Sequence, residues 1–294
     1  MSIPLVSVVL PTLNRAPFVS ETIRQLIAIT SIPFEIIVVD QSDQPLNIHI
    51  LEQSSFLVDF KYMFQQKKSL TLARNNSLSL CNAEIVLFLD DDIELLSDIV
   101  LEHFNAHQNS SCHIVTGRIT QRLGWNKPHL IYSNNPFLQY LYIDMDSKCD
   151  HINVYAIQGG NFSVKSIVFL SIKFDTNFVG VAYREETDFI FRCLEANFLA
   201  NYSAKCHIHH IAAPTGGVRK KSIFDSSQIF CLAYFSIKHF SKLKIYFLLD
   251  FKSALFSIFL NRKYIQSLYF YPLFLICGFY RFFLAIYLGI KNAQ

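Results

Sequence analysis

Short apolar segments that alternate with helical segments constrain the fold of this chain more than any other feature. Three of them are nearly continuous runs of branched and aromatic residues, at 6–10, 35–40 and 84–89. A run of this kind is typical of a strand that is buried on both faces of a sheet. Apolar residues at helical spacing occupy 20–30 and 71–81, as in parallel βαβ units. We therefore predict an α/β fold with a Rossmann-like mixed sheet flanked by helices.

Further segments complete this outline. Ser20 is a candidate N-cap for the first helix, because its hydroxyl can accept a backbone N–H there. A Gly-containing turn at 158–161 allows the backbone to approach a ligand closely. We expect shorter strands at 114–116, 154–157 and 161–164, a helix at 185–196, an extended stretch at 207–210 and helices beyond 222.

Acidic side chains stand at the ends of two predicted strands. Asp40 closes the second run, and Asp90, Asp91 and Asp92 follow the third. Ligands of α/β sheets bind beyond the carboxyl ends of the strands, so we expect these carboxylates to converge in space. Three adjacent carboxylates repel one another, and within a cleft they need a cation. A hard divalent ion such as Mg²⁺ or Mn²⁺ prefers carboxylate oxygens together with phosphate oxygens and waters.

The three aspartates are not equivalent as ligands. In an extended segment Asp90 and Asp92 point to one side and Asp91 to the other, so Asp92 is the better direct ligand. Asp90 is then suited to a ribose hydroxyl or a metal-bound water. The alternative is a solvated turn that caps a helix beginning at Ile93, and the triplet alone does not decide between the two.

A second group of carboxylates, Glu185, Glu186 and Asp188, occupies the start of the predicted helix at 185–196. The helix macrodipole favours negative charge there, which is a complete structural explanation for one or two of them. The functional interpretation is a general base that deprotonates an acceptor hydroxyl. Residues 185 and 188 share a helical face, so catalysis and anchoring of the helix could be divided among the three.

Histidines and basic residues form a third group. Three histidines, the last of them His210, precede a Gly-rich loop that continues into Arg219, Lys220 and Lys221. A neutral imidazole can complete a metal site made of carboxylates and phosphate, and a basic loop can close on a diphosphate. The alternatives are a surface histidine run and a solvated charge run.

Six short motifs occur in one order along the chain. They are PTLNR at 11–15, VVDQS at 38–42, ARN at 73–75, FLDDD at 88–92, GGNFS at 159–163 and EETD at 185–188. This ordered set resembles the family 2 glycosyltransferases with the GT-A fold, over roughly residues 5–220. The aspartate triplet resembles the DxD metal motif of that family, and Glu185-Glu186 resembles its ED motif.

The resemblance implies a role for each matched position. Nucleotide binding is implied for Thr12, Asn14, Arg15, Asp40, Arg74, Asp90 and Asp91. A loop beside the donor and acceptor is implied for Gly159, Gly160, Asn161, Asp188 and Arg219. A divalent metal, Mn²⁺ or Mg²⁺, is implied at Asp92, Asp90 and His210. Glu186 matches the usual base, but the family often has Asp there, so whether Glu185 or Glu186 is the base stays open.

The implied reaction is transfer of a sugar from a nucleotide-sugar donor to a hydroxyl of a saccharide or lipid-linked acceptor. A single in-line displacement inverts the anomeric carbon while a carboxylate takes the acceptor proton. We expect a metal-dependent, hexosyltransferase-like enzyme of cell-surface polysaccharide or glycolipid biosynthesis. The alternatives are a nucleotidyltransferase and a non-catalytic nucleotide-binding or scaffold protein on the same fold.

Charge divides the chain into two parts. Residues 1–224 hold 18 Lys/Arg and 21 Asp/Glu, whereas residues 225–294 hold 8 and 2. The overall charge of +3 is too small to indicate a nucleic-acid partner. We predict a catalytic domain at 1–222 and a basic, aromatic helical tail at 223–294.

The tail has the composition of a segment that contacts membranes. Residues 267–290 reach the length of about 20 that spans a bilayer, but Arg281 lies inside them. Basic, aromatic, amphipathic helices favour the interface of an anionic membrane. We therefore predict binding at a membrane surface, ahead of helices packed in the core or forming a homo-oligomer, and ahead of a true span.

Cysteine usage and the N-terminal residues indicate the compartment. The seven cysteines include no CxxC pair, and scattered thiols fit a reducing compartment. The first residues lack the basic region and cleavage site of a signal peptide. We expect a cytoplasmic protein that is peripheral at the cytoplasmic face of a membrane.

Overall fold

The computed structural model describes residues 3–47, 58–121, 146–180, 182–217, 227–239 and 271–292. The chain falls into two compact units. The first unit contains residues 1–68, 72–174 and 189–217, and the second unit contains residues 69–71, 175–188 and 218–294. The predicted domain boundary between 222 and 223 stays a prediction, and the second unit also includes the start of the predicted helix at 185–196.

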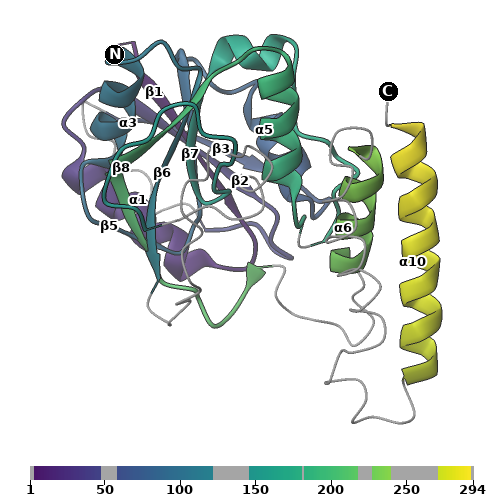
Figure 1. Cartoon of the computed structure of the whole chain (residues 1–294). Helices are drawn as coiled ribbons and strands as arrows, with labels where there is room; N and C mark the ends of the chain where they lie inside the picture. Colours follow the sequence, from purple (N-terminus) through teal and green to yellow (C-terminus); the bar gives the residue numbers. More distant parts are fainter. Residues whose placement is uncertain are drawn as a thin grey trace. The chain divides into compact units, whose positions relative to one another are not determined.

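The first unit is built on a mixed sheet (Figure 1). Its strands lie in the order β3-β2-β1-β4-β7-β6-β8-β5. In chain order they are β1 Val6–Thr12, β2 Phe34–Asp40, β3 Val58–Phe64, β4 Ile85–Leu89, β5 Ile93–Leu95, β6 Ile114–Gln121, β7 Asn161–Lys165 and β8 Ala200–His210. The helical elements between strands are α1 Ala16–Ile29, α2 Leu70–Ser77, α3 Ile99–Gln108, the 3₁₀ turn η2 Ser166–Leu170 and α5 Glu185–Glu195.

Strand directions divide this sheet into two halves. β1, β2, β3 and β4 run parallel, as the predicted βαβ units require. β7 is antiparallel to both β4 and β6, β6 is parallel to β8, and β5 is antiparallel to β8. The predicted α/β class with a mixed sheet and flanking helices is confirmed.

Alternate residues of the central strand β1 enter different hydrophobic cores. Val8 and Leu10 lie in the core that includes Leu26 of α1, whereas Val9 lies in the core that includes Ile190 of α5. The two-residue repeat of a strand produces this division. Because both faces are covered, the strand must be apolar throughout, which explains the continuous run in the sequence.

Two helix boundaries differ from those predicted. α1 begins at Ala16, so Ser20 lies inside the helix, and the N-cap is Arg15. Pro17 stands in the first turn, where its restricted φ favours a helix start. α2 ends at Ser77, before the predicted end at residue 81.

The segment that follows the aspartate triplet is a strand and not a helix. Ile93–Leu95 forms β5 and pairs with β8, while the next helix, α3, is capped by Asp98, which accepts the Leu101 N–H at 3.1 Å. The alternative that the triplet caps a helix at Ile93 is therefore wrong. The strand expected at 154–157 is also wrong, because the backbone there is irregular.

The second unit contains α6 Ser227–Lys238 and α10 Tyr271–Lys291, which pack against each other (Figure 1). A Cβ at Gly289 would stand 2.7 Å from the Ile237 side chain. The two helices can therefore approach closely at Gly289 because glycine has no side chain. The helical tail is confirmed for α6 and α10, while residues 240–270 lie outside the described ranges. Among the described helices, none has the length and apolar character needed to cross a membrane.

Candidate active site

The aspartate triplet follows β4 directly and precedes β5, at the carboxyl edge of the sheet. The Asp90 N–H donates to the Gly160 carbonyl at 3.2 Å, and the Asp92 carbonyl accepts the Ile211 N–H at 2.9 Å. The turn is therefore held by the segments before β7 and after β8. Its backbone position is determined by contacts with residues that are distant in sequence.

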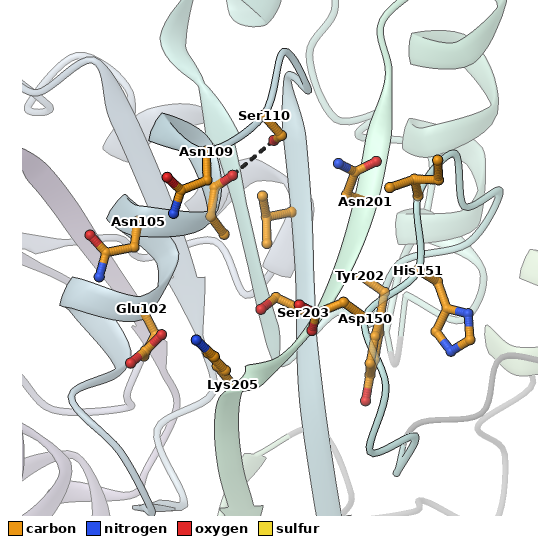
Figure 2. A pocket seen from close by; sticks show the side chains of 13 residues that line it. Glu102, Asn105, Asn109, Ser110, Asp150, His151, Asn201, Tyr202, Ser203 and Lys205 are labelled. Atoms are coloured by element: carbon orange, nitrogen blue, oxygen red, sulfur yellow. Dashed lines mark hydrogen bonds between the residues drawn. The ribbon is translucent and has the colours of Figure 1, made fainter.

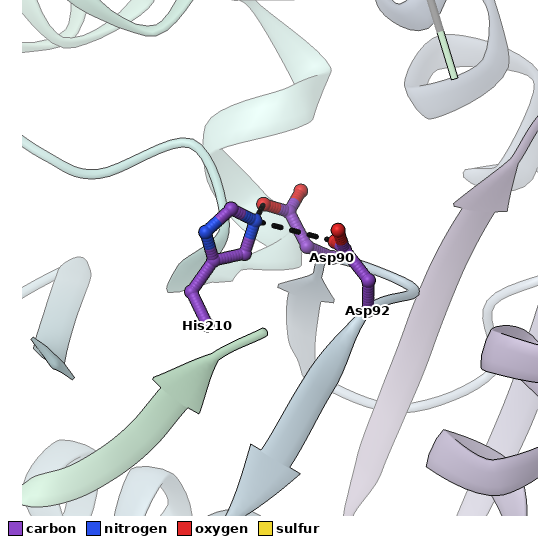
Figure 3. A group of neighbouring side chains, drawn as sticks. All are labelled: Asp90, Asp92 and His210. Atoms are coloured by element: carbon purple, nitrogen blue, oxygen red, sulfur yellow. Dashed lines mark ion pairs between the residues drawn. The ribbon is translucent and has the colours of Figure 1, made fainter. Parts of the chain in front are cut away.

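Asp90, Asp92 and His210 form the candidate metal site (Figure 3). One ligand atom from each lies within 4.8 Å of the others. His210 Nε2 is 3.2 Å from Asp92 Oδ1 and 3.7 Å from Asp90 Oδ2. The pairing of β8 with β5 aligns His210 with Ile93 and so brings the imidazole to the triplet. Two carboxylates and one imidazole are a donor set that fits a divalent cation such as Mn²⁺.

Asp92 is the most deeply buried of the three donors. Its side chain is 1% exposed, and Oδ2 accepts the Ala213 N–H at 2.7 Å. Burial alone would raise the pKa of Asp92. The His210 imidazole and the Arg15 guanidinium outweigh this effect and hold the pKa below its ordinary value. Oδ1 lies 3.2 Å from Arg15 Nη1 but accepts no hydrogen bond from the described residues. A buried carboxylate oxygen in this position fits direct coordination of a cation.

Asp91 points away from this cluster, as the alternation of an extended segment predicts. It accepts the Thr12 hydroxyl at 2.6 Å and Arg15 Nη1 at 2.8 Å. Burial raises the pKa of Asp91 to about 6, against the opposing effect of Arg15. The described contacts of Asp91 therefore join the triplet to the start of α1, and its implied contact with a nucleotide stays a prediction.

Asp40 organises the loop that follows β2. Its side chain is fully buried, Oδ1 accepts the Ser42 N–H at 2.8 Å, and Oδ2 accepts the Leu46 N–H and the Tyr62 hydroxyl, both at 2.8 Å. Asp40 also pairs in register with Thr12 of β1. Asp40 and the triplet therefore lie at the same edge of the sheet, on either side of Thr12, and a ligand site shared by these carboxylates stays a prediction.

The loops after β1 and β2 are joined by Asn14. Its N–H donates to Ser42 Oγ at 2.8 Å, and its side chain exchanges two hydrogen bonds with Asp43, both of 2.9 Å. Asn14 adopts a φ of 54°, in the left-handed region that Asn tolerates better than most residues. Contact of Asn14 with a nucleotide is not tested by this geometry.

Arg74 lies inside the first unit and is almost fully buried. Nη2 donates to the Gly159 carbonyl at 2.7 Å, and the guanidinium lies 5.3 Å from the ring centroids of both Phe162 and Phe174. Such cation–π contacts stabilise a desolvated arginine. Arg74 thus supports the turn before β7, and its implied contact with a nucleotide stays a prediction.

The turn at Gly159–Asn161 is packed tightly against the triplet. A Cβ at Gly160 would stand 2.4 Å from Asp90 Oδ2. The fully buried Asn161 accepts from His103 Nε2 at 2.9 Å through Oδ1, and its Nδ2 donates to the carbonyls of Arg118 and Cys206. The described contacts of Asn161 are therefore structural, and its place beside the donor stays a prediction.

The predicted catalytic carboxylates lie in the first turn of α5, in the second unit. Glu185 and Asp188 are buried, and Glu186 is half-buried. Asp188 forms an ion pair with Lys238 and a hydrogen bond with His239, at the end of the α6 region. Glu185 and Glu186 stay alternatives for the base, and Arg219 lies outside the described residues.

Two kinds of contributor are absent from the predicted site residues. Ala213 acts through its backbone N–H, which no side-chain pattern reveals. Lys238 ends the apolar helix α6 and His239 follows it, and basic residues at the end of a buried helix are a signal that could have been noticed.

The first unit also contains a polar hollow of about 320 Å³ (Figure 2). Its lining includes Tyr202 and Ser203 near the start of β8, whereas His210 ends that strand. Successive strand residues advance by about 3.3 Å, so the hollow lies well away from the candidate metal site. Among the described residues, those predicted for catalysis or binding do not line it.

The mixed sheet, with its acidic turn at the carboxyl edge, defines the class of GT-A glycosyltransferases. The sequence profile of Glycosyl transferase family 2 matches residues 7–169, more than half of the chain. The chain belongs to this family.

Relatives and solved structures agree with this assignment. Poly(ribitol-phosphate) beta-N-acetylglucosaminyltransferase TarP of Staphylococcus aureus (strain N315) is 29% identical over 118 residues, which are 38% of this chain and 36% of TarP. The match thus spans little more than a third of that relative. A crystal structure of S. aureus TarS in complex with UDP-GlcNAc has a TM-score of 0.66 at 16% identity, over 96% of this chain and 81% of that chain.

A second solved structure is mannosyltransferase PcManGT from Pyrobaculum calidifontis in complex with GDP-Man and Mn²⁺. It has a TM-score of 0.57 at 15% identity, over 99% of this chain and 88% of that chain. At such identities the likeness shows the fold, and the predicted GT-A fold is confirmed.

Proposed function

We propose that this protein is an inverting, metal-dependent glycosyltransferase that moves a sugar from a nucleotide-sugar to a hydroxyl acceptor. The observation that carries the proposal is the cluster of Asp90, Asp92 and His210 at the carboxyl edge of the sheet. Ligands of α/β folds bind at this edge, and the chain belongs to a glycosyltransferase family.

Asp90, Asp92 and His210 are the residues that would hold Mn²⁺ or Mg²⁺. A divalent ion there would supply positive charge to the diphosphate leaving group. The Asp92 carboxylate is oriented for this role. The Ala213 N–H binds its Oδ2, and its Oδ1 faces His210. Arg15 completes the charge balance around the two buried aspartates of the turn.

Acceptor activation is assigned to the first turn of α5. Glu186, or Glu185 beside it, takes the proton of the acceptor hydroxyl as that oxygen attacks the anomeric carbon. The attack comes opposite the leaving group, so the configuration inverts. The helix N-terminus favours the ionised form of a carboxylate in this turn. The basic residues Arg219 and Lys220 are proposed to approach the diphosphate.

The relatives suggest which substrates to test first. TarS was crystallised with UDP-GlcNAc, and TarP is named for transfer of N-acetylglucosamine to poly(ribitol-phosphate). We therefore propose a UDP-linked hexosamine as donor and a hydroxyl of a cell-surface polysaccharide or glycolipid as acceptor. GDP-Man, found with PcManGT, is the contrasting donor.

Association with the surface of an anionic membrane is part of the proposal. Four large side chains on one face of α10 are more than 60% exposed: Tyr280, Phe283, Tyr287 and Ile290. Residues 225–294 also carry a six-charge excess of Lys and Arg over Asp and Glu. Aromatic side chains on one face of a basic segment favour a membrane interface.

Product analysis tests the proposed reaction. The protein is incubated with UDP-GlcNAc or GDP-Man and Mn²⁺, and the released species is identified by chromatography. We expect a nucleoside mono- or diphosphate, and we expect Asp92→Asn to lower turnover more than about 100-fold, because a direct ligand is lost. Asp59→Asn, a surface carboxylate on β3, is the matched control.

Other outcomes identify the alternatives. Release of inorganic diphosphate would indicate a nucleotidyltransferase. Absence of both turnover and of any donor-induced rise in thermal stability would indicate a non-catalytic protein, because ligands that bind the native state raise its stability.

A further inference from the structure

Asp188, in the first turn of α5, is a buried carboxylate that needs partners. Its side chain is 0% exposed, and an isolated charge at such a site is strongly unfavourable. Two of its partners come from the end of the α6 region. Lys238 Nζ lies 2.7 Å from Asp188 Oδ1, and His239 Nε2 lies 2.9 Å from the same oxygen.

Lys238 also binds a second carboxylate. Its Nζ lies 2.7 Å from Asp175 Oδ2, which accepts the Tyr234 hydroxyl at 2.7 Å. Burial alone would raise the pKa of Asp175. Lys238 and Tyr234 outweigh this effect and hold the pKa below its ordinary value. Lys238 therefore ties α6 both to the turn at Asp175 and to the start of α5.

The entry into α5 is strained, so it needs such a restraint. Ala182 has a φ of 48° and Arg184 a φ of 73°, in the left-handed region that disfavours residues with a Cβ. Conformations of this kind persist where surrounding contacts determine them, and they cluster at functional sites. The Asp188 N–H closes the turn by donating to the Arg184 carbonyl at 2.9 Å.

The first turn of α5 is also the turn that carries Glu185 and Glu186. Residues three apart in a helix share a face, so Asp188 and Glu185 move together when the turn rotates. A contact that holds Asp188 therefore holds the orientation of both candidate bases. Misplacement of a catalytic group by about 1 Å can cost 10²-fold in rate.

We propose that Lys238 and His239 are positioning residues that hold the base-bearing turn of α5 through Asp188. The inference rests on the proposed function, because it requires the general base to be Glu185 or Glu186. It assigns part of the tail region a role in the reaction itself, in addition to any contact with membranes.

Steady-state kinetics of Lys238→Met and His239→Gln test the inference, with Lys238→Arg as the conservative variant. We expect kcat to fall about tenfold to 100-fold in Lys238→Met, while the KM for the donor and the Mn²⁺-dependent donor-induced thermal shift stay unchanged. Lys238→Arg should recover most of the loss, because arginine can also pair with both carboxylates. Lys173→Met, an exposed lysine, is the matched control and should leave kcat unchanged.

A double variant keeps the test valid if Lys238→Met does not fold. Asp188→Asn with Lys238→Met removes both charges of this pair, so Asp188 is not left as an unpaired buried charge, and Asp175 keeps its hydrogen bond from the Tyr234 hydroxyl. We expect it to fold with a low kcat. A wild-type kcat in this double variant, or in folded Lys238→Met together with His239→Gln, would overturn the inference.

Failure of the proposed function gives a different result. Wild-type turnover in both Glu185→Gln and Glu186→Gln would show that neither glutamate is the general base, and would reject that part of the proposed function. Loss of turnover in one of them, with normal kcat in the Lys238 and His239 variants, would instead leave the base in place and reject only the positioning role.

Discussion

At the residue scale, Gly160 offers the sharpest test of the candidate metal site. An alanine Cβ there would stand 2.4 Å from Asp90 Oδ2. The Asp90 side chain is 42% exposed, so it can move away without disturbing the core. We expect Gly160→Ala to weaken Mn²⁺ binding about tenfold to 100-fold, the usual effect of changes beside a metal ligand. The free energy of unfolding should change by less than about 1 kcal/mol.

Calorimetric titration of the protein with Mn²⁺ measures this effect, and Gly159→Ala is the matched control. Neither glycine has a positive φ, so alanine introduces no backbone strain at either position. Equal Mn²⁺ affinities for the two variants would contradict the placement of Asp90 among the ligands.

Residue-scale prediction succeeded where local geometry decides the outcome. The two-residue alternation of an extended segment places Asp90 and Asp92 together and Asp91 apart, as the side-chain contacts confirm. The partners of Asp91 could not be predicted, because Thr12 and Arg15 lie more than 75 residues away along the chain.

At the element scale, α10 presents an unusual apolar face. Tyr280, Phe283 and Tyr287 are 65%, 63% and 64% exposed, although they are large and apolar. Residues at this spacing share one side of a helix. We expect the full chain to float with vesicles of phosphatidylglycerol and phosphatidylcholine, and less well with pure phosphatidylcholine vesicles.

Replacing Phe283 and Tyr287 with serine should weaken vesicle binding about tenfold or more, since each buried aromatic contributes at least about 1.5 kcal/mol. The matched control replaces Ile167 and Leu170 of η2, which are also exposed. Vesicle binding that is equal for both double variants, or absent in the wild-type chain, would contradict membrane contact through α10.

Element types were easier to predict than element boundaries. The continuous apolar runs identify β1, β2 and β4 because burial on both faces requires them. β5 was missed because a three-residue strand has too few positions to show a period. It forms by pairing with β8, and that partner lies more than 100 residues further along the chain.

At the scale of the whole molecule, stability should depend on two buried histidines of α3. His103 and His107 share hydrogen bonds with Ser163 of β7. Burial lowers the pKa of His103 from 6.5 to about 4 and that of His107 from 6.5 to about 3. The unfolded chain therefore binds protons below pH 6.5 that the folded chain does not, and stability falls as the pH drops.

Each histidine should lower the free energy of unfolding by about 2 kcal/mol when the pH falls from 7 to 5. Urea unfolding at both pH values measures this loss. Asp91, with its pKa raised to about 6, acts in the opposite direction, because its folded form takes up a proton in the same range. The comparison is therefore with the variant in which both histidines are glutamine, which should lose less stability. The same loss in both proteins would contradict the prediction.

Local sequence determined which segments form the buried strands, which polar or acidic residues follow each strand, and where helices lie between them. These features follow from burial and from helix and strand periods, which act over a few residues. Tertiary structure alone decided which of the charged residues meet. Asp92 reaches His210, and Asp188 reaches Lys238, only because sheet pairing and helix packing bring distant segments together. Ion pairs form between the charged groups that the fold brings close together. The spacing of residues along the chain does not predict which distant groups these are.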